Sequence, residues 1–525
     1  MTRVPIKQAP IKRARRRVST VICAALLFSA TAADAHVGSP DVYADGNAGP
    51  YRLSIVLRPP MVIPGVTEIE VRAETPGIDG IAITPIPLTG EASHHPPVPD
   101  AMVRPSNDAQ FFTGHLWIMA TGSWQIRFQV SGKQGAGQLS IPLPATALAT
   151  KKMQPALGVF LAFLGIVLVL GMIGIVGAAA REAKLAPGTA PQASGRRSGR
   201  IAMAAAAVFL IAGVVLGNVW WKAEAADYSG YVYKPLQMTP HLQTGNVLGI
   251  KLHDPGWLSQ RKLDDFILDH NHLMHLYMIR WPQMDVVFHL HPEAVETGKF
   301  ELALPSMPAG DYHLYADVVH ANGFPETIVG SIDLPQISGR ALAGDDAKGA
   351  AKPVDSASPG GSAQPAAHNA DRTQRFSLPD GYTMIWHEPD ALVPKAPESF
   401  RFELVDAQGK PPADMALYMG MLGHAAFVKT DGSVFAHIHP NGTVAMAAFM
   451  MANTNSPAAM GGAAASQSIS SMAMPGMNMP ASALPNSVSF PYGFPSPGDY
   501  RIFVQMKHGA TVETGIFDAQ VQASK

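Results

Sequence analysis

The chain has 525 residues, of which 47% are hydrophobic, and its formal net charge at pH 7 is −1. One hydrophobic core does not grow to this length, so several domains are expected. Nothing in this near balance of charge favours nucleic acid or another polyanion, so we expect no nucleic-acid partner. The sequence also lacks the phosphate-binding, dinucleotide-binding, serine-hydrolase and zinc-protease motifs, so we do not expect an enzyme.

The first 35 residues have the pattern of a secretory signal. A basic stretch precedes a short apolar run, and an Ala-Asp-Ala sequence ends at Ala35. Cleavage there makes His36 the first residue and removes Cys23, the one cysteine in the chain. The mature protein then has no thiol for a disulfide or a thiolate metal site. The alternative is an N-terminal anchor that is not cleaved.

Residues 36–150 predict a first β domain. Alternating apolar and polar runs at 51–59, 67–74 and 123–132 are separated by Pro- and Gly-containing turns. Short alternating strands of this kind are typical of an antiparallel, Ig-like β-sandwich.

Two apolar runs, 155–180 and 201–221, are each long enough to cross a bilayer as a helix. The intervening segment, 181–200, is rich in Arg and Lys and is therefore predicted to be cytoplasmic. The domains on either side then face outward, so we expect a bacterial inner-membrane protein with most of its chain on the periplasmic side. Neither run has a charged residue or histidine in its interior, which indicates anchors and not an ion pathway.

Two later segments, 228–335 and 376–525, repeat one pattern. Each has a strand that ends in His-x-His-Pro, then Gly-Asp-Tyr, then a histidine eight residues after the tyrosine. Such a repeat indicates one structural unit used twice, and the strand patterns predict two further sandwiches. We interpret the similar runs MHLYM at 274–278 and MALYM at 415–419 as part of the same repeat.

The remaining parts of the repeats are assigned to the fold. We expect 336–375, rich in Ala, Gly, Ser and Pro, to be a flexible linker, and 455–487 to be a disordered, Met-rich insertion in the second copy. Gly-Asp-Tyr is interpreted as a turn followed by a tyrosine that hydrogen-bonds back across the corner of a sandwich. The whole chain is therefore predicted to be mainly β, with three sandwiches and two transmembrane helices.

The paired histidines are the main functional signal. Residues two apart in a strand share a face, so His289 and His291 are expected to lie side by side, as are His437 and His439. Two neutral imidazoles suit copper, or zinc as the second choice, and need a third ligand. The alternative is a solvated sheet face. Further candidate ligands are the recurring His320 and His508, together with His270, His272, His275 and His424.

The insertion of the second copy adds a different kind of ligand. Its SMAMPGMNMP run brings four thioethers close together in sequence, and thioethers favour Cu(I). The alternative is drift in a low-complexity loop. The residues concerned are Met472, Met474, Met477 and Met479.

A histidine at a mature N-terminus can chelate Cu(II) through its amine and ring. On the His36 start, the size and the exported compartment, the first domain resembles copper-binding proteins of the copper-resistance C (CopC-like) type. It lacks the Asp-x-His motif of that type. The outer domains, through motifs such as FHLHP and PAGDYHLYADV, loosely resemble the YtkA-like and FixH-like group, in which such domains accompany copper handling and oxidase assembly.

These features together predict a membrane-anchored, exported copper-binding protein that stores copper, confers resistance or delivers copper to a partner metalloprotein or oxidase. The alternative is a cell-envelope interaction or sensory module in which the histidines have no metal role.

Overall fold

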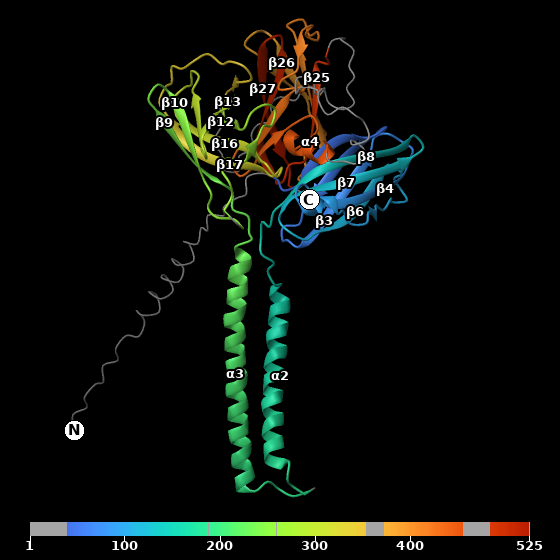
Figure 1. Ribbon diagram of the computed structural model, residues 1–525, viewed down its shortest axis with the longest axis vertical. Helices are drawn as coiled ribbons and strands as arrows, with labels where there is room; N and C mark the ends of the chain where they lie inside the picture. The colour runs from blue at the N-terminus through green and yellow to red at the C-terminus, as the bar shows by residue number, and fades with distance from the viewer. Residues whose placement is uncertain (1–38, 187, 259, 353–371, 455–483, 524–525) are drawn as a thin grey trace, which may run out of the picture. The chain divides into compact units, whose positions relative to one another are not determined.

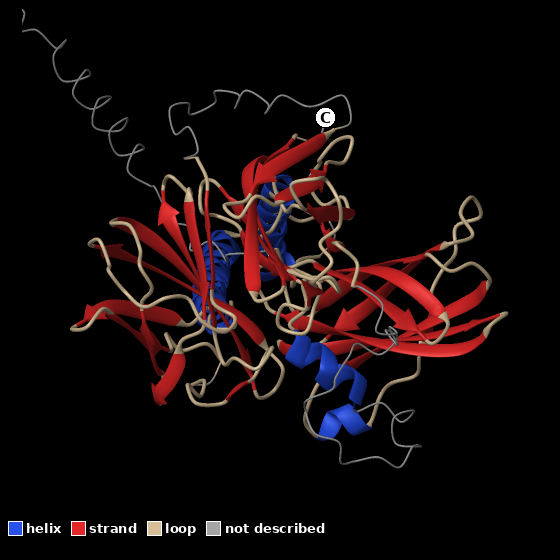
Figure 2. Ribbon diagram, turned by 90° about the horizontal axis from the view of Figure 1, so that it is seen from above, coloured by secondary structure: helices blue, strands red, loops and turns tan. Residues whose placement is uncertain are grey.

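The computed structural model describes residues 39–186, 188–258, 260–352, 372–454 and 484–523. This part of the chain is mainly β, with several antiparallel sandwich sheets and two long apolar helices, as the sequence predicted (Figure 1; Figure 2). The predicted signal, His36 and the four loop methionines, Met472, Met474, Met477 and Met479, lie outside the described residues.

The first sandwich has two four-stranded sheets, with the strand orders β1-β2-β3-β6 and β5-β4-β7-β8. Alternation places Leu53, Ile55 and Leu57 on the buried face of β2, where each contributes about 1.5–3 kcal/mol of apolar burial. The elements are β1 (Val42–Ala48), β2 (Tyr51–Arg58), β3 (Gly65–Ala73), β4 (Ile78–Pro87), the 3-10 helix η1 (Glu91–His94), β5 (Asp100–Ala101), β6 (Phe111–Ile118), β7 (Gly122–Gly132) and β8 (Gly135–Ala145).

Two helices follow, α2 (Pro155–Glu182) and α3 (Ala193–Ser229), with mean hydropathies of 3.0 and 2.2 over their most apolar windows. They run side by side (Figure 1), and a Cβ on Gly199 would lie only 3.0 Å from the carbonyl oxygen of Gly177. The segment 181–200 is not a simple loop, because α3 begins at Ala193. The Arg residues that precede Ile201 favour helix, so α3 begins N-terminal to the predicted apolar run.

The second sandwich, called repeat 1, consists of the sheets β14-β15-β10-β9 and β11-β16-β12-β13-β18, with β17 also paired to β16. Its strands are β9 (Gln237–Gln243), β10 (Val247–His253), β11 (Phe266–Ile267), β12 (His275–Trp281), β13 (Val286–Leu290), β14 (Glu293–Glu296), β15 (Lys299–Ala303), β16 (Gly310–His320), β17 (Pro325–Leu334) and β18 (Ala347–Ala350).

The third sandwich, called repeat 2, consists of the sheets β19-β20-β21-β25 and β22-β26-β23-β24, with β27 also paired to β26. Its elements are β19 (Thr373–Ser377), β20 (Thr383–His387), β21 (Glu398–Val405), β22 (Met415–Ala416), β23 (His424–Lys429), β24 (Phe435–Ile438), α4 (Met446–Thr454), β25 (Ser487–Tyr492), β26 (Gly498–His508) and β27 (Thr511–Val521).

The second sheets of the two repeats correspond strand by strand. This correspondence changes which residues of repeat 1 match the run 415–419 of repeat 2. β22 begins opposite His508, just as β11 begins opposite His320. The run 415–419 therefore corresponds to 266–270, and its predicted match to 274–278 is wrong. The residue of repeat 2 that corresponds to His275 is His424, because each opens the strand next in order, β12 or β23.

The predicted linker also needs correction, because 336–352 is part of repeat 1. Ile337 exchanges backbone hydrogen bonds with Met307, and β18 adds a strand to β13. The Gly and Ala residues that suggested a linker allow close packing here, since Gly349 lies against Thr514 of repeat 2. The rest of the predicted linker, 353–371, lies outside the described residues.

The Gly-Asp-Tyr element has the structural role predicted for it. The hydroxyls of Tyr312 and Tyr500 each donate to the carbonyl four residues upstream, at 2.8 Å in both cases. The glycine that opens each strand has φ of +145° or +132°, a backbone conformation that favours glycine. In the first sandwich, Trp124 Nε1 donates to the carbonyl of Ala120 at 2.9 Å in the same way.

The two repeats pack through the outer faces of their second sheets. Side chains from β12, β13 and β16 meet those from β23, β24 and β26 in a buried cluster that is separate from the cores of the two sandwiches. At its centre the rings of Tyr315 and Phe435 stack with their centroids 4.3 Å apart. This cluster, the inter-repeat core, fixes the two sheets face to face.

Candidate metal centre

Eight histidines from both repeats continue the inter-repeat core as one polar cluster. Neighbouring rings within it have centroids between 3.8 and 6.1 Å apart. Pairs two residues apart lie together as predicted, at 4.8 Å for His289 with His291 and 4.6 Å for His437 with His439. The eight residues are His270, His272, His275, His289, His291, His424, His437 and His439.

Three of these histidines, all from repeat 1, form group A: His275, His289 and His291. One ring nitrogen from each lies within 4.8 Å of the other two, and all three side chains are buried. The other ring nitrogen of each donates to an oxygen of the protein. The three bonds are from His275 Nε2 to the Asp269 carbonyl (3.0 Å), from His289 Nδ1 to Gln505 Oε1 (2.9 Å) and from His291 Nδ1 to Asp346 Oδ1 (3.1 Å).

These bonds determine which nitrogen of each neutral ring carries the proton. His275 Nδ1 and His289 Nε2 then face each other as two lone pairs only 3.2 Å apart. His291 Nε2 is buried without a hydrogen-bond partner in the described part of the chain. Two nitrogens bound tetrahedrally at about 2.0–2.1 Å from one ion lie about 3.4 Å apart. The spacing in group A therefore suits a shared cation.

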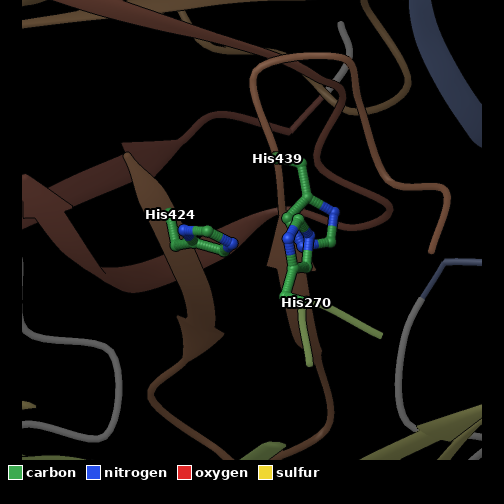
Figure 3. A group of neighbouring side chains, drawn as sticks. All are labelled: His270, His424 and His439. Carbon is green, nitrogen blue, oxygen red and sulfur yellow. The ribbon is translucent and has the colours of Figure 1, made fainter. Parts of the chain in front are cut away.

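Group B draws ligands from both repeats: His270 from repeat 1, and His424 and His439 from repeat 2. His270 Nδ1 donates to the Met419 carbonyl at 2.8 Å, and His439 Nδ1 donates to the Val444 carbonyl at 3.2 Å. Their Nε2 atoms, and both ring nitrogens of His424, have no hydrogen-bond partner among the described residues. Figure 3 shows the His424 ring directed toward the rings of the other two.

His437 lies between the two groups. Its ring centroid is 4.6 Å from that of His439 in group B and 5.5 Å from that of His275 in group A. Its Nδ1 donates to Asp317 at 3.1 Å, while its Nε2 is buried and unpartnered within the described residues. His437 is thus oriented as a further ligand for either group. His272 lies at the edge, stacked 3.8 Å from His291.

The two repeats hold each other's histidines in a reciprocal way. Gln505 of repeat 2 accepts from His289 of repeat 1, and Asp317 of repeat 1 accepts from His437 of repeat 2. Asp317 and Gln505 occupy the same position in β16 and β26, five residues after the tyrosine of Gly-Asp-Tyr. The interface thus has approximate two-fold symmetry, and neither pair of histidines is positioned by its own sandwich alone.

The electrostatic environment keeps the rings neutral. Burial, reinforced by neighbouring histidines, lowers the pKa of His275, His289, His424 and His439 well below the usual value of 6.5. A neutral imidazole is the form that binds a metal. Each buried, unpartnered nitrogen costs about 1–3 kcal/mol, and such clusters in a native core call for an explanation such as a bound ion.

The recurring histidines His320 and His508 are not brought to the pairs, contrary to expectation. His320 bonds to Asp265 and Glu326 at 2.8 and 3.2 Å, and His508 bonds to Asp380 at 3.2 Å. The reason is strand parity. Eight residues is an even spacing, so each histidine shares the inner face of its sandwich with the preceding tyrosine, opposite the face that carries the pairs.

The residues that orient the ligands were missed in the sequence, for different reasons. Asp346 was hidden because it lies in the segment predicted as a linker. Gln505 and Asp317 carried a usable signal, since an odd spacing from the tyrosine places them on the histidine face. The contact of Met419 with His270 is made by its backbone carbonyl oxygen, which side-chain patterns do not reveal.

Comparisons with known proteins identify one domain. A family model described as a domain of unknown function (DUF8832) matches residues 377–523, which correspond to repeat 2. No curated protein matches the chain.

Several solved structures are similar at low sequence identity. The tetra-tandem repeat in the extending region of a large adhesion protein is 8% identical, with 92% of this chain and 83% of that chain covered and a TM-score of 0.15. A 1.5-MDa bacterial ice-binding adhesin is 6% identical, with 91% and 99% covered and a TM-score of 0.14. Native Escherichia coli alpha-2-macroglobulin is 9% identical, with 91% and 23% covered and a TM-score of 0.19. Scores this low carry no argument about function.

Proposed function

We propose that the protein is a membrane-anchored, exported metal-binding protein that holds copper between its two repeats. Its role would be to store copper, to confer resistance or to deliver copper to a partner metalloprotein or oxidase, with binding and not catalysis as its activity. One observation carries the proposal: buried ring nitrogens that donate to no oxygen of the protein converge in two sets of three, one in group A and one in group B.

The ligand chemistry supports a transition metal. Groups A and B contain only imidazoles, and imidazole suits copper and zinc where carboxylate and carbonyl oxygens suit magnesium and calcium. Copper binds such sites more tightly than zinc. The cost of burying an ion rises steeply with its charge, and these neutral ligands do not offset that charge. A buried all-histidine site therefore favours monovalent Cu(I), with zinc as the second choice.

The two apolar helices support the placement of this activity at a membrane. Their lipid-length apolar windows are unburied in the structure, which is the state expected of spans that lie in a bilayer. With the positive segment between them on the cytoplasmic side, all three sandwiches would face the periplasm. The Met-rich run at 472–479 would then be available as an exchangeable Cu(I) ligand.

Metal titration of the full-length protein in detergent tests the proposal. Cu(I) under reducing conditions, Cu(II) and Zn(II) are added separately, and bound metal is counted by mass spectrometry after dialysis. We expect two tightly bound Cu(I) ions, and nitrogen coordination by X-ray absorption. The double variant His289→Ala/His424→Ala should lose both ions, while the control His253→Ala, at an exposed position on β10, should keep them. Binding weaker than micromolar, or unaffected by the double variant, would refute the proposal.

A further inference from the structure

A second polar cluster lies in repeat 2, at the end of β26. His508 Nε2 is 3.2 Å from Asp380 Oδ2 and 3.5 Å from Glu513 Oε1, and one ligand atom from each of the three lies within 4.8 Å of the others. Asp414 Oδ2 is 3.6 Å from His508 Nδ1. The side chains of His508 and Glu513 are only 10% and 6% exposed, whereas that of Asp380 is 34% exposed.

Repeat 1 has the corresponding cluster at the end of β16. His320 corresponds to His508, and Glu326 corresponds to Glu513, since each glutamate pairs with the residue two before the histidine. In repeat 1 a cation completes the cluster, because Arg261 Nη1 donates to Glu326 Oε1 at 2.8 Å. The Tyr233 hydroxyl and the Leu236 N–H donate to the same oxygen, at 2.8 and 2.6 Å.

Repeat 2 lacks this cation. Lys410 corresponds to Arg261, because the backbone N–H of each bonds to the aspartate that follows a strand end, Asp406 or Asp254. Lys410 is exposed, however, and no Lys or Arg within the described ranges forms an ion pair with the carboxylates of this cluster. Three carboxylates thus surround a buried histidine without the positive charge that neutralises the equivalent site in repeat 1.

We propose that Asp380, His508 and Glu513 bind a divalent cation at the place that the Arg261 guanidinium occupies in repeat 1. This site is distinct from groups A and B and does not depend on the function proposed for them. The cation supplies the charge that the cluster lacks, as a buried carboxylate requires.

The ligands define the class of cation. One imidazole with carboxylates suits Mn(II) or Zn(II), and the absence of soft ligands in the cluster disfavours Cu(I). The site is also pre-organised, since the Tyr382 ring stacks 4.2 Å from the His508 ring and holds its orientation. With a metal on Nε2, the ring proton would sit on Nδ1, which has no hydrogen-bond partner among the described residues and lies 3.6 Å from Asp414 Oδ2. A carboxylate near this nitrogen is the usual outer partner of a metal-bound histidine.

Mn(II) titration of the metal-free, full-length protein in detergent tests this inference, with free Mn(II) followed by electron paramagnetic resonance. We expect one bound ion per chain. Asp380→Asn and Glu513→Gln should each weaken binding at least tenfold, because each removes one negative ligand. The matched control is Asp265→Asn in repeat 1, which should bind Mn(II) like the unchanged protein.

A further variant separates this site from the histidine groups. His424→Ala should leave Mn(II) binding unchanged even where it removes the copper ion of group B, so either proposal can fail alone. If Glu513→Gln does not fold, Asp380→Asn decides, because Asp380 lies on a turn with a partly exposed side chain. Failure of the unchanged protein to bind Mn(II), or full binding by Asp380→Asn, overturns the inference.

Discussion

Groups A and B each contain three imidazoles, but the two groups are assembled differently. All ligands of group A come from repeat 1, while group B combines His270 of repeat 1 with His424 and His439 of repeat 2. A metal in group A can bind to one sandwich, whereas a metal in group B must also hold the two sandwiches together. The difference shows how a duplicated domain gains a site that neither copy has alone.

The two groups differ because His270 of repeat 1 takes the place in group B that His437 would have by correspondence with group A. By correspondence with group A, repeat 2 could form a set from His424, His437 and His439 alone. Instead, His270 reaches across the interface, where it also bonds to the Met419 carbonyl, and His437 is left between the groups. Position 419 is the counterpart of position 270, so this contact joins equivalent positions near the approximate two-fold axis.

Acid should produce the largest effect, and it should act on both groups alike. The folded-state pKa values of His275, His289, His424 and His439 are lowered, so below pH 6.5 the unfolded chain binds protons that the folded chain does not. Stability is therefore full above pH 6.5 and is lost as the pH falls, by about 1.4 kcal/mol per pH unit for each histidine. Bound copper should be released over the same range.

Chemical denaturation of the metal-free protein between pH 5 and pH 8 measures this dependence. Groups whose pKa is raised in the folded protein oppose it, among them Glu513 and His320. Burial beside Asp380 raises the pKa of Glu513 to about 7, and hydrogen bonds to Glu326 and Asp265 outweigh burial to raise the pKa of His320. Both therefore lose stabilising effect as the pH rises. Because the lowered histidines outnumber them, a stability that increases toward pH 5 would contradict the neutral cluster.

Removal of one ligand from group B should have a smaller effect that separates the groups. We expect His270→Ala to lose one of the two copper ions, because only group B uses this residue. At a copper concentration 1,000 times the Kd, the lost ion removes about 4 kcal/mol of stabilisation. The matched variant His275→Ala should lose the other ion. Titration and thermal unfolding, with and without copper, measure both effects, and equal loss of both ions in both variants would mean that the groups form one site.

The sequence predicted much of this arrangement, and strand parity explains both its successes and its failures. Because residues two apart share a face, the side-by-side placement of the two histidine pairs was correct. The same rule, applied to the even spacing between Tyr312 and His320, would have excluded His320 as their third ligand. The alternation of side chains along a strand is therefore enough to show that His320 does not belong with the histidines of group A.

Group B could not be predicted in the same way. His270 and His424 are 154 positions apart, and they meet only because two sheets pack face to face through Tyr277, Tyr315 and Phe435. Nothing in the spacing of a single repeat indicates which of its faces will cover the other copy. Which face covers the other copy depends on the burial of apolar side chains across the interface. In the sequence these side chains look like those of any strand, so they do not reveal the partner sheet.

The smallest predicted effect concerns how far metal binding by group A depends on repeat 2. Its ligands all lie in repeat 1, but Gln505 of repeat 2 accepts the hydrogen bond that holds His289 with Nε2 toward the site. Loss of such an outer partner weakens metal binding about 10- to 100-fold. We therefore expect Gln505→Leu to lower copper affinity in group A while group B keeps its ion.

The counterpart Asp317→Asn is the control, because an amide oxygen can still accept from His437 and neither group should lose an ion. Competition titration with a Cu(I) chelator resolves the two affinities. If Gln505→Leu leaves the affinity of group A unchanged, then group A belongs to repeat 1 alone. If the affinity falls as expected, both groups depend on the interface, and metal binding in either one favours the packed form of the two repeats by the same linkage.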